Sequence, residues 1–197
     1  MTDLSDTLAA FDAVMRADQR LAEGVRPEQW EDPTPCPDWN VRQLVAHLAG
    51  GNRMFAAIIA GERAESPEAL QRLRARVGLG PQDDPVSYFR ESVRELAAIF
   101  EQPGFLDGTY PTPIGPRGGE FVVGMRITEG LVHGWDLARA TGQPAGLPDD
   151  VAAATLETVR KTVGAGPRRS HAFGEEQPAP PDAPAVDRLA AFLGRRL

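Results

Sequence analysis

Four long segments of this chain repeat apolar residues at intervals of three and four positions, the spacing of one face of an α-helix. They cover residues 4–22, 41–60, 85–100 and 119–142. Each segment is polar on its other face, so each must bury its apolar stripe against a neighbouring element. This pattern predicts an all-α protein whose core is a four-helix bundle.

Capping residues indicate where these helices begin and end. Asn40 followed by Gln43 forms a capping-box pattern at the start of the second helix. Asp84 followed by Pro85 is typical of a helix start, and Gly142 suits the position after the last turn of the fourth helix. The connection between the second and third helices is long and carries a short helical piece of its own. The expected bundle therefore has a long crossover between its second and third helices.

The rest of the chain predicts one extended loop and two short helices. Prolines within residues 109–120 exclude a central strand and favour an extended or hairpin-like loop. Residues 149–163 and 184–193 have helical apolar spacing. We therefore expect a four-helix bundle in residues 1–145 and a C-terminal helical extension in residues 146–197 that packs on it.

Composition narrows the classes of function. The net charge of −7 argues against a general nucleic-acid binder, which gains affinity by neutralising phosphates. No apolar run approaches the ~20 residues that span a bilayer, and the first six residues lack the basic start and apolar core of a signal peptide. Cys36 is the sole cysteine, which excludes an internal disulfide and fits a reducing cytoplasm. We therefore expect a cytoplasmic protein with small-molecule partners, either a monomer or a homodimer.

Three residues form a candidate metal site. His133 lies four residues after Glu129, so both side chains leave the fourth helix on the same face. His47 lies within the apolar run of the second helix. Two imidazoles and one carboxylate leave a tetrahedral metal with one open position, which is the pattern of a catalytic zinc site.

Each of these signals has a simpler explanation when it is taken alone. Glu129 and His133 could form a surface hydrogen bond, and a buried His47 could bond to a carbonyl oxygen. Together on inward faces of two helices, however, an ionised carboxylate and imidazoles need one another or a cation.

Two charged residues lie near Glu129 and His133 in the sequence, and each has more than one possible role. Asp136, three positions after His133, either orients a ligand imidazole from a second layer, or is a solvated acid or part of an interhelix salt bridge. Arg126, three positions before Glu129, either binds an anionic group of a substrate or pairs with Glu129.

For several other residues, a structural role is a better explanation than a role in the functional site. We expect Cys36 to be a packed loop residue rather than a nucleophile. Trp135 lies ~200° around the helix from His133 and is expected in the core or an interface. The fourth helix should bury Phe121, Met125, Leu131, Val132, Trp135, Leu137 and Ala138. A basic loop could hold a carboxylate over the site, although a solvated loop is the favoured interpretation; it contains Arg168, Arg169 and His171. Candidates to line a cavity are Asn52, Phe55 and Tyr110.

Two stretches of sequence carry a family resemblance. One runs from Thr34 to Leu48 and reads TPCPDWNVRQLVAHL, and the other runs from Glu129 to Gly142 and reads EGLVHGWDLARATG. Together they resemble the DinB-like superfamily, in its branch of mycothiol-dependent maleylpyruvate isomerase-like proteins from actinobacteria. The end of the chain, from Phe173 onward, also resembles short members of that branch.

The resemblance implies a DinB-type bundle that holds a divalent metal, usually zinc. In this pattern one His comes from the second helix, and a Glu or His plus a second His come from the fourth. His47, Glu129 and His133 match these positions. One departure matters, because the isomerase proper has a substantial C-terminal domain, whereas only residues 143–197 follow Gly142 here. Neither maleylpyruvate as substrate nor any C-terminal catalytic residue is therefore carried over.

These observations lead to one main functional hypothesis and two alternatives. The main hypothesis is a metal-dependent thiol S-transferase or isomerase that uses Zn²⁺ and mycothiol on a small electrophile. The first alternative is a metal-dependent hydrolase, for which Asp136 is the only nearby general base that the sequence offers. The second is a non-catalytic bundle that binds a metal or a small ligand.

Overall fold

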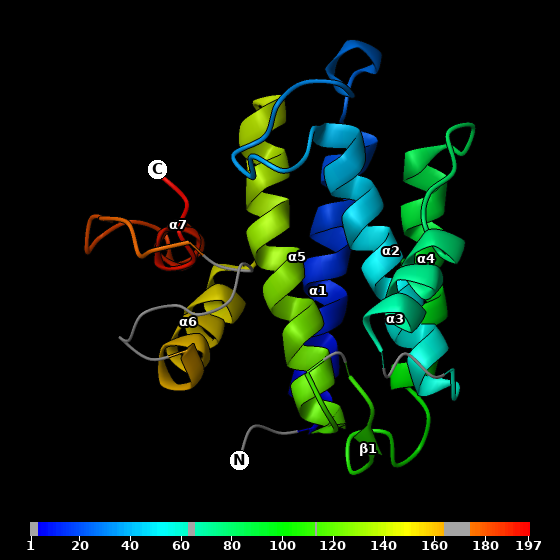
Figure 1. Cartoon of the computed structure of the whole chain (residues 1–197). Coiled ribbons are helices and arrows are strands. Elements are labelled where there is room, and N and C mark those ends of the chain that lie inside the picture. Colours follow the sequence, from blue (N-terminus) through cyan, green and yellow to red (C-terminus); the bar gives the residue numbers. More distant parts are fainter. Residues whose placement is uncertain (1–3, 63–65, 113, 164–173) are drawn as a thin grey trace.

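Four long helices run side by side and form the body of the protein (Figure 1). They are α1 (Leu4–Glu23), α2 (Val41–Ile59), α4 (Pro85–Phe100) and α5 (Gly119–Thr141). Helix α1 contacts α4 and α5, and α2 contacts the same two helices, so the four close into a bundle. The computed structural model describes residues 4–62, 66–112, 114–163 and 174–197. The expected all-α bundle is confirmed.

Shorter elements connect the bundle helices. The loop after α1 contains the 3₁₀ turn η1 (Pro27–Gln29), and the long crossover from α2 to α4 contains α3 (Pro67–Arg76). Strands β1 (Thr109–Tyr110) and β2 (Arg117–Gly118) pair antiparallel directly before α5, which confirms the hairpin-like loop. Helices α6 (Asp149–Val163) and α7 (Ala185–Phe192) complete the chain and lie on the side of α5 away from α2 and α4 (Figure 1).

The helix ends follow the capping signals in the sequence. The Asn40 side chain accepts a hydrogen bond from the Gln43 amide (2.8 Å), and the Gln43 side chain accepts one from the Asn40 amide (3.0 Å). This reciprocal capping box satisfies two amides at the first turn of α2 that have no partner within the helix. Asp84 caps α4 through the Ser87 amide (2.8 Å), and Gly142 ends α5 with φ 68°.

The inner faces of the four helices form one apolar core. Its largest fully buried side chains come from every bundle helix and include Met15, Leu44, Leu48, Phe89, Leu96, Phe100, Leu131 and Trp135. Burying a side chain of this size contributes ~1.5–3 kcal/mol. The expectation that Phe121 is buried was wrong, because this residue is 40% exposed. It lies in the first turn of α5, where the helix meets the hairpin, and Arg117 lies over its ring.

Helices α1 and α5 approach closely at two glycines. A Cβ atom built on Gly134 would lie 2.1 Å from Asp18 Oδ1, and one built on Gly130 would lie 2.8 Å from Asp18 Oδ2. Asp18 is fully buried, and neither of its carboxyl oxygens has a hydrogen-bond partner among the described residues. Burial therefore raises the pKa of Asp18 well above its usual value.

The C-terminal helices pack on each other and on α5. Trp135 lies at the contact between α5 and α7, where its indole N–H donates to Asp187 Oδ1 (2.6 Å). It is 2% exposed, as the sequence predicted for an interface or core position. The division of the chain at residue 145 stays a prediction.

The chain end turns back toward the bundle at Gly194. This residue has φ 100°, and a Cβ atom built on it would lie 2.5 Å from the Cα atom of Gly174. A residue with a side chain fits neither this backbone conformation nor this space. The turn directs the next residue, Arg195, toward α5, where it contacts Asp136.

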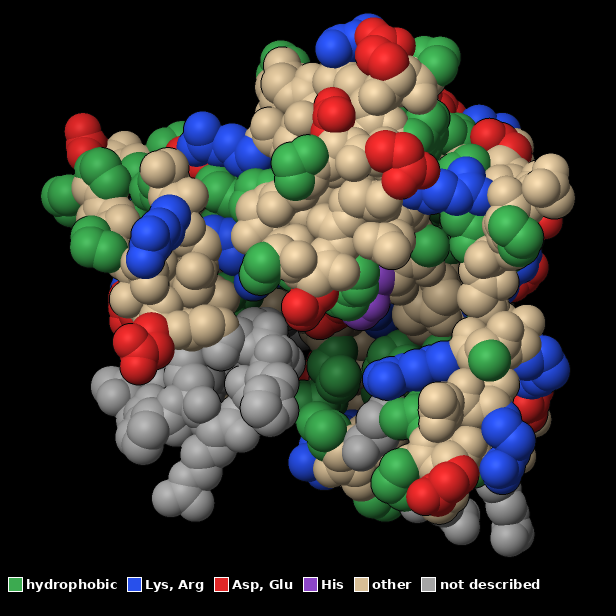
Figure 2. Space-filling model, turned by 45° about the horizontal axis from the view of Figure 1, so that its top comes forward, with side chains coloured by type: hydrophobic (Ala, Val, Ile, Leu, Met, Phe, Trp, Pro, Cys, Tyr) green, Lys and Arg blue, Asp and Glu red, His purple; other side chains and the backbone are tan. Residues whose placement is uncertain are grey.

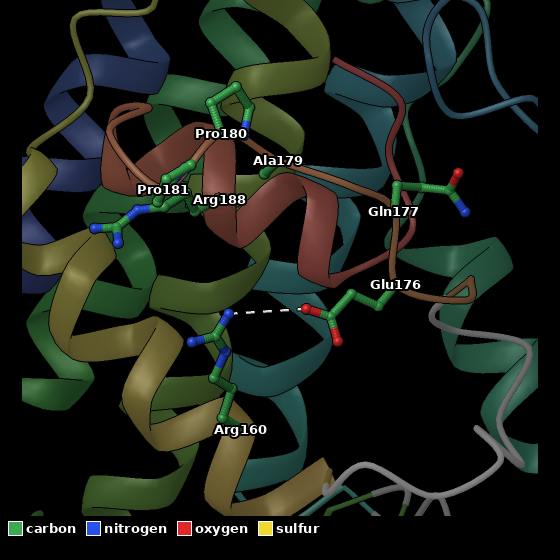
Figure 3. Close-up of a pocket in the computed structure, with 7 residues that line it drawn as sticks. All are labelled: Arg160, Glu176, Gln177, Ala179, Pro180, Pro181 and Arg188. Carbon is green, nitrogen blue, oxygen red and sulfur yellow. Dashed lines mark ion pairs between the residues drawn. The ribbon is translucent and has the colours of Figure 1, made fainter.

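A cavity of about 290 Å³ lies in the C-terminal extension (Figure 3). It is lined by Arg160, Glu176, Gln177, Ala179, Pro180, Pro181 and Arg188. Glu176 Oε1 lies 3.8 Å from Arg160 Nη2, so one of the two arginines already has an acidic partner. None of the residues that the sequence proposed for a functional site lines this cavity, so the candidate site remains at His47, Glu129 and His133.

No helix in the described part of the chain combines the length and apolar composition that crossing a membrane requires.

Candidate metal centre

Three side chains from two neighbouring helices meet at one point. They are His47 from α2 and Glu129 and His133 from α5. His47 Nε2 lies 3.0 Å from Glu129 Oε2, and His133 Nε2 lies 3.6 Å from the same oxygen. One potential ligand atom from each residue lies within 4.8 Å of the other two. The structure thus brings together the trio that the sequence grouped, while its role as a metal site stays a prediction.

Local geometry explains why these side chains converge. Glu129 and His133 are one turn apart on α5 and share a face. The capping box at Asn40 fixes where α2 begins, and hence which face of α2 carries His47. Because α2 packs against α5, the two faces point toward each other.

The trio is partly open to solvent. The side chains of His47 and Glu129 are 33% and 27% exposed, and that of His133 is 7% exposed. Figure 2 shows histidine surface, in purple, at the edge of a hollow bordered by apolar, acidic and basic side chains. A small molecule can therefore approach the ligand atoms, as a catalytic metal site requires.

Electrostatics keep the carboxyl group of Glu129 ionised. Burial alone would raise its pKa, but contacts with His133 and His47 and the charge of Arg126 hold the pKa well below its usual value. Glu129 is therefore a carboxylate at neutral pH, the form that binds a cation.

The two histidines differ in their protonation. Burial lowers the pKa of His47, and the contact with Glu129 offsets this only in part. Burial also acts to lower the pKa of His133, but its contacts with Asp136 and Glu129 raise it above the ordinary value. His47 is therefore the neutral imidazole at pH 7, and a cation at the trio would compete with the proton on His133.

A second layer of charged side chains supports His133. Its Nδ1–H donates to Asp136 Oδ2 (3.0 Å), which leaves Nε2 facing Glu129. Arg195 in turn donates to both oxygens of Asp136, from Nη2 to Oδ2 (2.8 Å) and from Nε to Oδ1 (3.1 Å). Asp136 is fully buried and forms an ion pair with Arg195 as well as the contact with His133, so it is not a solvated acid. Its role in orienting a ligand imidazole stays a prediction. Sequence analysis did not identify Arg195, because no local spacing relates it to α5.

Trp39 covers one face of His47. The two rings are stacked with centroids 4.0 Å apart and an angle of 24° between their planes. The same indole meets the ring of His133 edge-on, with centroids 5.4 Å apart. Its proximity to the trio was missed, although Trp39 directly precedes the N-cap of the helix that carries His47.

Arg126 is held inside the bundle by neutral partners. Its Nε donates to Asn52 Oδ1 (3.1 Å) and its Nη2 to the carbonyl oxygen of Leu48 (3.3 Å). Asn52 Nδ2 donates to Ser92 Oγ (3.2 Å), so this buried network joins α5, α2 and α4. Arg126 forms no direct ion pair with Glu129 in the described structure, but its charge lowers the pKa of that carboxyl group.

Cys36 lies close to the second layer. Its sulfur and one atom each of His133 and Asp136 lie within 4.8 Å of one another, which defines a second group of potential ligands. This group fits a metal less well than the trio does, because Arg195 already occupies both oxygens of Asp136. Burial raises the pKa of the Cys36 thiol. A buried, protonated thiol agrees with the expected packing role.

Other candidates from the sequence lie elsewhere or outside the described residues. Phe55 is buried in the core, and Tyr110 stacks on Phe105 with ring centroids 4.5 Å apart. Neither ring makes an aromatic contact with the histidines of the trio among the described residues. The basic loop lies outside the described residues, and with it Arg168, Arg169 and His171.

The trio fits a divalent cation. Two imidazole nitrogens and one carboxylate oxygen are ordinary zinc ligands with bonds of ~2.0–2.2 Å, which places neighbouring ligand atoms of a tetrahedral site ~3.4 Å apart. The separations of 3.0 and 3.6 Å bracket that value. The protonation states also suit a cation. Glu129 is ionised, and the hydrogen bond of His133 Nδ1 to Asp136 leaves Nε2 as the nitrogen that can bind a metal.

Comparison of the sequence with known families and proteins gives consistent matches. Residues 11–138 match the family model described as the mycothiol maleylpyruvate isomerase N-terminal domain. The chain is 35% identical over 194 residues to two uncharacterized proteins of Mycobacterium tuberculosis, Rv0738 of strain H37Rv and MT0763 of strain CDC 1551. These alignments cover 96% of this chain and 98% of each relative.

Two solved structures have a similar fold. The crystal structure of the mycothiol-dependent maleylpyruvate isomerase superposes with a TM-score of 0.64 at 20% identity, over 81% of this chain and 71% of that one. A mutant of the same isomerase gives a TM-score of 0.61 at 16% identity, over 82% and 73% of the two chains. At these identities the similarity establishes the fold alone.

Proposed function

Because this chain belongs to the family of the mycothiol maleylpyruvate isomerase N-terminal domain, we propose that it is a divalent-metal-dependent enzyme that activates a low-molecular-weight thiol. The proposed thiol is mycothiol, which the solved isomerase of the same fold requires according to its description. The proposed reaction is S-transfer to, or isomerisation of, a small electrophile. The observation that carries this proposal is the convergence of His47, Glu129 and His133 at a partly exposed point.

We assign metal binding to these three residues and take Zn²⁺ as the metal. Imidazole nitrogen and carboxylate oxygen donors suit this ion, and three protein ligands leave one position for a substrate. A divalent cation held by His47, Glu129 and His133 would supply Lewis acidity, which would favour the thiolate form of a thiol brought beside it.

The surrounding residues keep the trio ready to bind a cation. Asp136 accepts the Nδ1–H of His133, which directs Nε2 toward Glu129. Arg195 compensates the buried charge of Asp136. The charge of Arg126 favours the ionised state of Glu129. These contacts support a site whose donor atoms are set in place before any ligand arrives.

Both proposed reactions share their first step. The thiol releases its proton to solvent, and the resulting thiolate sulfur donates its electron pair to form a bond to the electrophilic carbon of the substrate. With a halide, the C–halogen bond breaks and the halide ion leaves with its electron pair. With an epoxide, the C–O bond breaks and the alkoxide takes a proton from solvent, and in both cases the S-conjugate is the product. With an activated double bond, rotation about the former double bond and loss of the same thiol give the isomer. The geometry of the trio serves either outcome.

The structure weakens the hydrolase alternative. That reaction needs a general base near the metal, and Asp136 was the one candidate in the sequence. Asp136 is fully buried, and its two oxygens accept hydrogen bonds from His133 and Arg195. A carboxylate in this environment has a pKa below its usual value, since these bonds outweigh the effect of burial. It is therefore a poor acceptor for a proton from water.

Elemental analysis of the purified protein, followed by cobalt exchange, tests the proposal. We expect one divalent metal per chain by family analogy, and we expect mycothiol to change the visible spectrum of the cobalt protein. We also expect loss of monochlorobimane, an electrophilic reagent, that depends on both mycothiol and metal. Absence of metal would favour a non-catalytic bundle, and metal-dependent hydrolysis without thiol would favour a hydrolase.

The cellular setting and assembly are part of the proposal. A thiol-dependent reaction and a single free cysteine are compatible with a reducing cytoplasm, where we propose that the protein acts. Whether it is a monomer or a homodimer stays a prediction.

A further inference from the structure

The two histidines of the trio are held in different ways. The Nδ1 atom of His133 donates to Asp136, which is the usual arrangement for a metal-binding histidine. The one hydrogen bond of the His47 ring runs through Nε2 to Glu129 (3.0 Å). Among the described residues, His47 Nδ1 forms no hydrogen bond. Another contact must therefore fix the orientation of this ring.

The indole of Trp39 supplies that contact. Its ring is stacked on the imidazole of His47, with the ring centroids 4.0 Å apart and an angle of 24° between the ring planes. Such a pair contributes ~0.5–1.5 kcal/mol beyond the burial of its surface. Stacking restricts the tilt of the imidazole plane, and the direction of the Nε2 lone pair depends on that plane.

The backbone around Trp39 is itself fixed. The Trp39 amide donates to the Cys36 carbonyl (3.1 Å), and Thr34 Oγ1 donates to the Trp39 carbonyl (2.8 Å). Pro33 and Asn40 form an isolated antiparallel bridge that closes the loop. The residue before an N-cap usually packs on the fourth residue of its helix, whereas this indole stacks on His47, the seventh. The loop thus presents a rigid aromatic face to the trio.

We propose that Trp39 is a positioning residue of the metal site, which orients His47 by stacking as Asp136 orients His133 by hydrogen bonding. The inference rests on the proposed function, because it takes His47 as a ligand. Loss of an orienting residue around a metal typically lowers metal affinity by 10–100-fold. Removing the stack is therefore expected to weaken the binding of Co²⁺ without removing any donor atom.

Trp30 provides a matched control. It lies in the same loop and, like Trp39, is a partly buried side chain packed against the core. Neither imidazole of the trio makes a ring contact with Trp30 among the described residues. Replacing Trp30 therefore removes packing of the loop alone, whereas replacing Trp39 also removes the stack on His47.

The experiment compares Co²⁺ affinity and the visible spectrum of the cobalt site in wild type, Trp39→Leu, Trp39→Phe and Trp30→Leu. Circular dichroism verifies the fold of each variant. We expect Trp39→Leu to bind Co²⁺ about 10-fold or more weakly with an altered spectrum. Trp39→Phe, which keeps an aromatic face, should recover most of the affinity, and Trp30→Leu should bind as wild type does.

Each other result overturns the inference. Wild-type affinity and spectrum in Trp39→Leu would show that the stack does not orient His47. An equal loss in Trp30→Leu would show a general effect of loop packing. If Trp39→Leu does not fold, Trp39→Met and Trp30→Met, which keep a long apolar side chain but no aromatic face, carry the test, and equal Co²⁺ affinities and spectra in these two variants would contradict the proposal. Failure of the wild-type protein to bind Co²⁺ would instead refute the proposed function, and the inference with it.

Discussion

Arg195 and Asp136 lie 59 positions apart in the sequence and form a two-bond ion pair beside the trio. The guanidinium comes from the end of the chain, after α7, and the carboxylate comes from α5. Asp136 is fully buried and also accepts a hydrogen bond from His133. The C-terminal extension therefore contributes directly to the environment of the candidate metal centre.

Replacement of Arg195 by Gln should affect both stability and metal binding. Asp136 would lose its cationic partner, and breaking a buried ion pair in this way costs about 3 kcal/mol. The hydrogen bond from His133 Nδ1 to Asp136 would also change, so we expect the affinity for Zn²⁺ to fall by about 10-fold. Urea unfolding and chelator competition measure the two effects. The exposed neighbour Arg196, changed to Gln, is the control and should change neither quantity.

Replacement of His133 by Ala should abolish metal binding. The substitution removes one of three proposed ligands and leaves a site that has only His47 and Glu129. Elemental analysis of the purified variant measures the outcome. Glu120→Gln, which neutralises an exposed acid on the same helix, should keep the full metal content. Full occupancy in His133→Ala would refute the ligand assignment.

Two glycines on α5 should respond to alanine in opposite directions. At Gly134, a Cβ would lie 2.1 Å from Asp18 Oδ1 and 3.1 Å from a Leu147 methyl carbon, so the helices must separate. We expect Gly134→Ala to lower the free energy of unfolding by about 1–3 kcal/mol, the usual range for overpacking. At Gly124, a Cβ would meet no atom within 4 Å, and alanine should stabilise the helix by about 0.5–1 kcal/mol. Thermal and urea unfolding of both variants test this contrast.

Asp18 should make the stability of the protein depend on pH. Burial raises its pKa in the folded state well above its ordinary value, so the folded protein keeps a proton that the unfolded chain releases. Stability from this group is complete below pH ~4 and is lost as the pH rises toward the folded pKa, by up to about 1.4 kcal/mol per pH unit.

Asn at position 18 cannot ionise, so Asp18→Asn should resemble wild type near pH 4 and become increasingly more stable than wild type above it. Urea unfolding between pH 4 and pH 8 measures the difference. Asp12→Asn, on the exposed face of the same helix, is the control and should show no such divergence. Parallel pH profiles for wild type and Asp18→Asn would contradict the buried position of this carboxyl group.

Local signals in the sequence were sufficient for the helices and for the core of the site. Apolar spacing predicted each bundle helix, and the Asn40 capping box began α2 where the pattern indicated. The pair Glu129 and His133 could be grouped because four residues make one helical turn. These properties depend on neighbours in sequence, so they can be inferred without knowing how the helices pack.

Long-range contacts decided the rest. Stacking of Trp39 on His47, the ion pair of Arg195 with Asp136, and the burial of Asp18 against Gly134 each depend on a loop, a chain end or a helix crossing. No spacing rule relates such positions, because their distances are set by how several elements pack at once. The sequence by itself determined which helices form and which faces they bury. Only the tertiary structure decided which side chains surround the trio, since it alone fixes the relative positions of α2, α5 and the chain end.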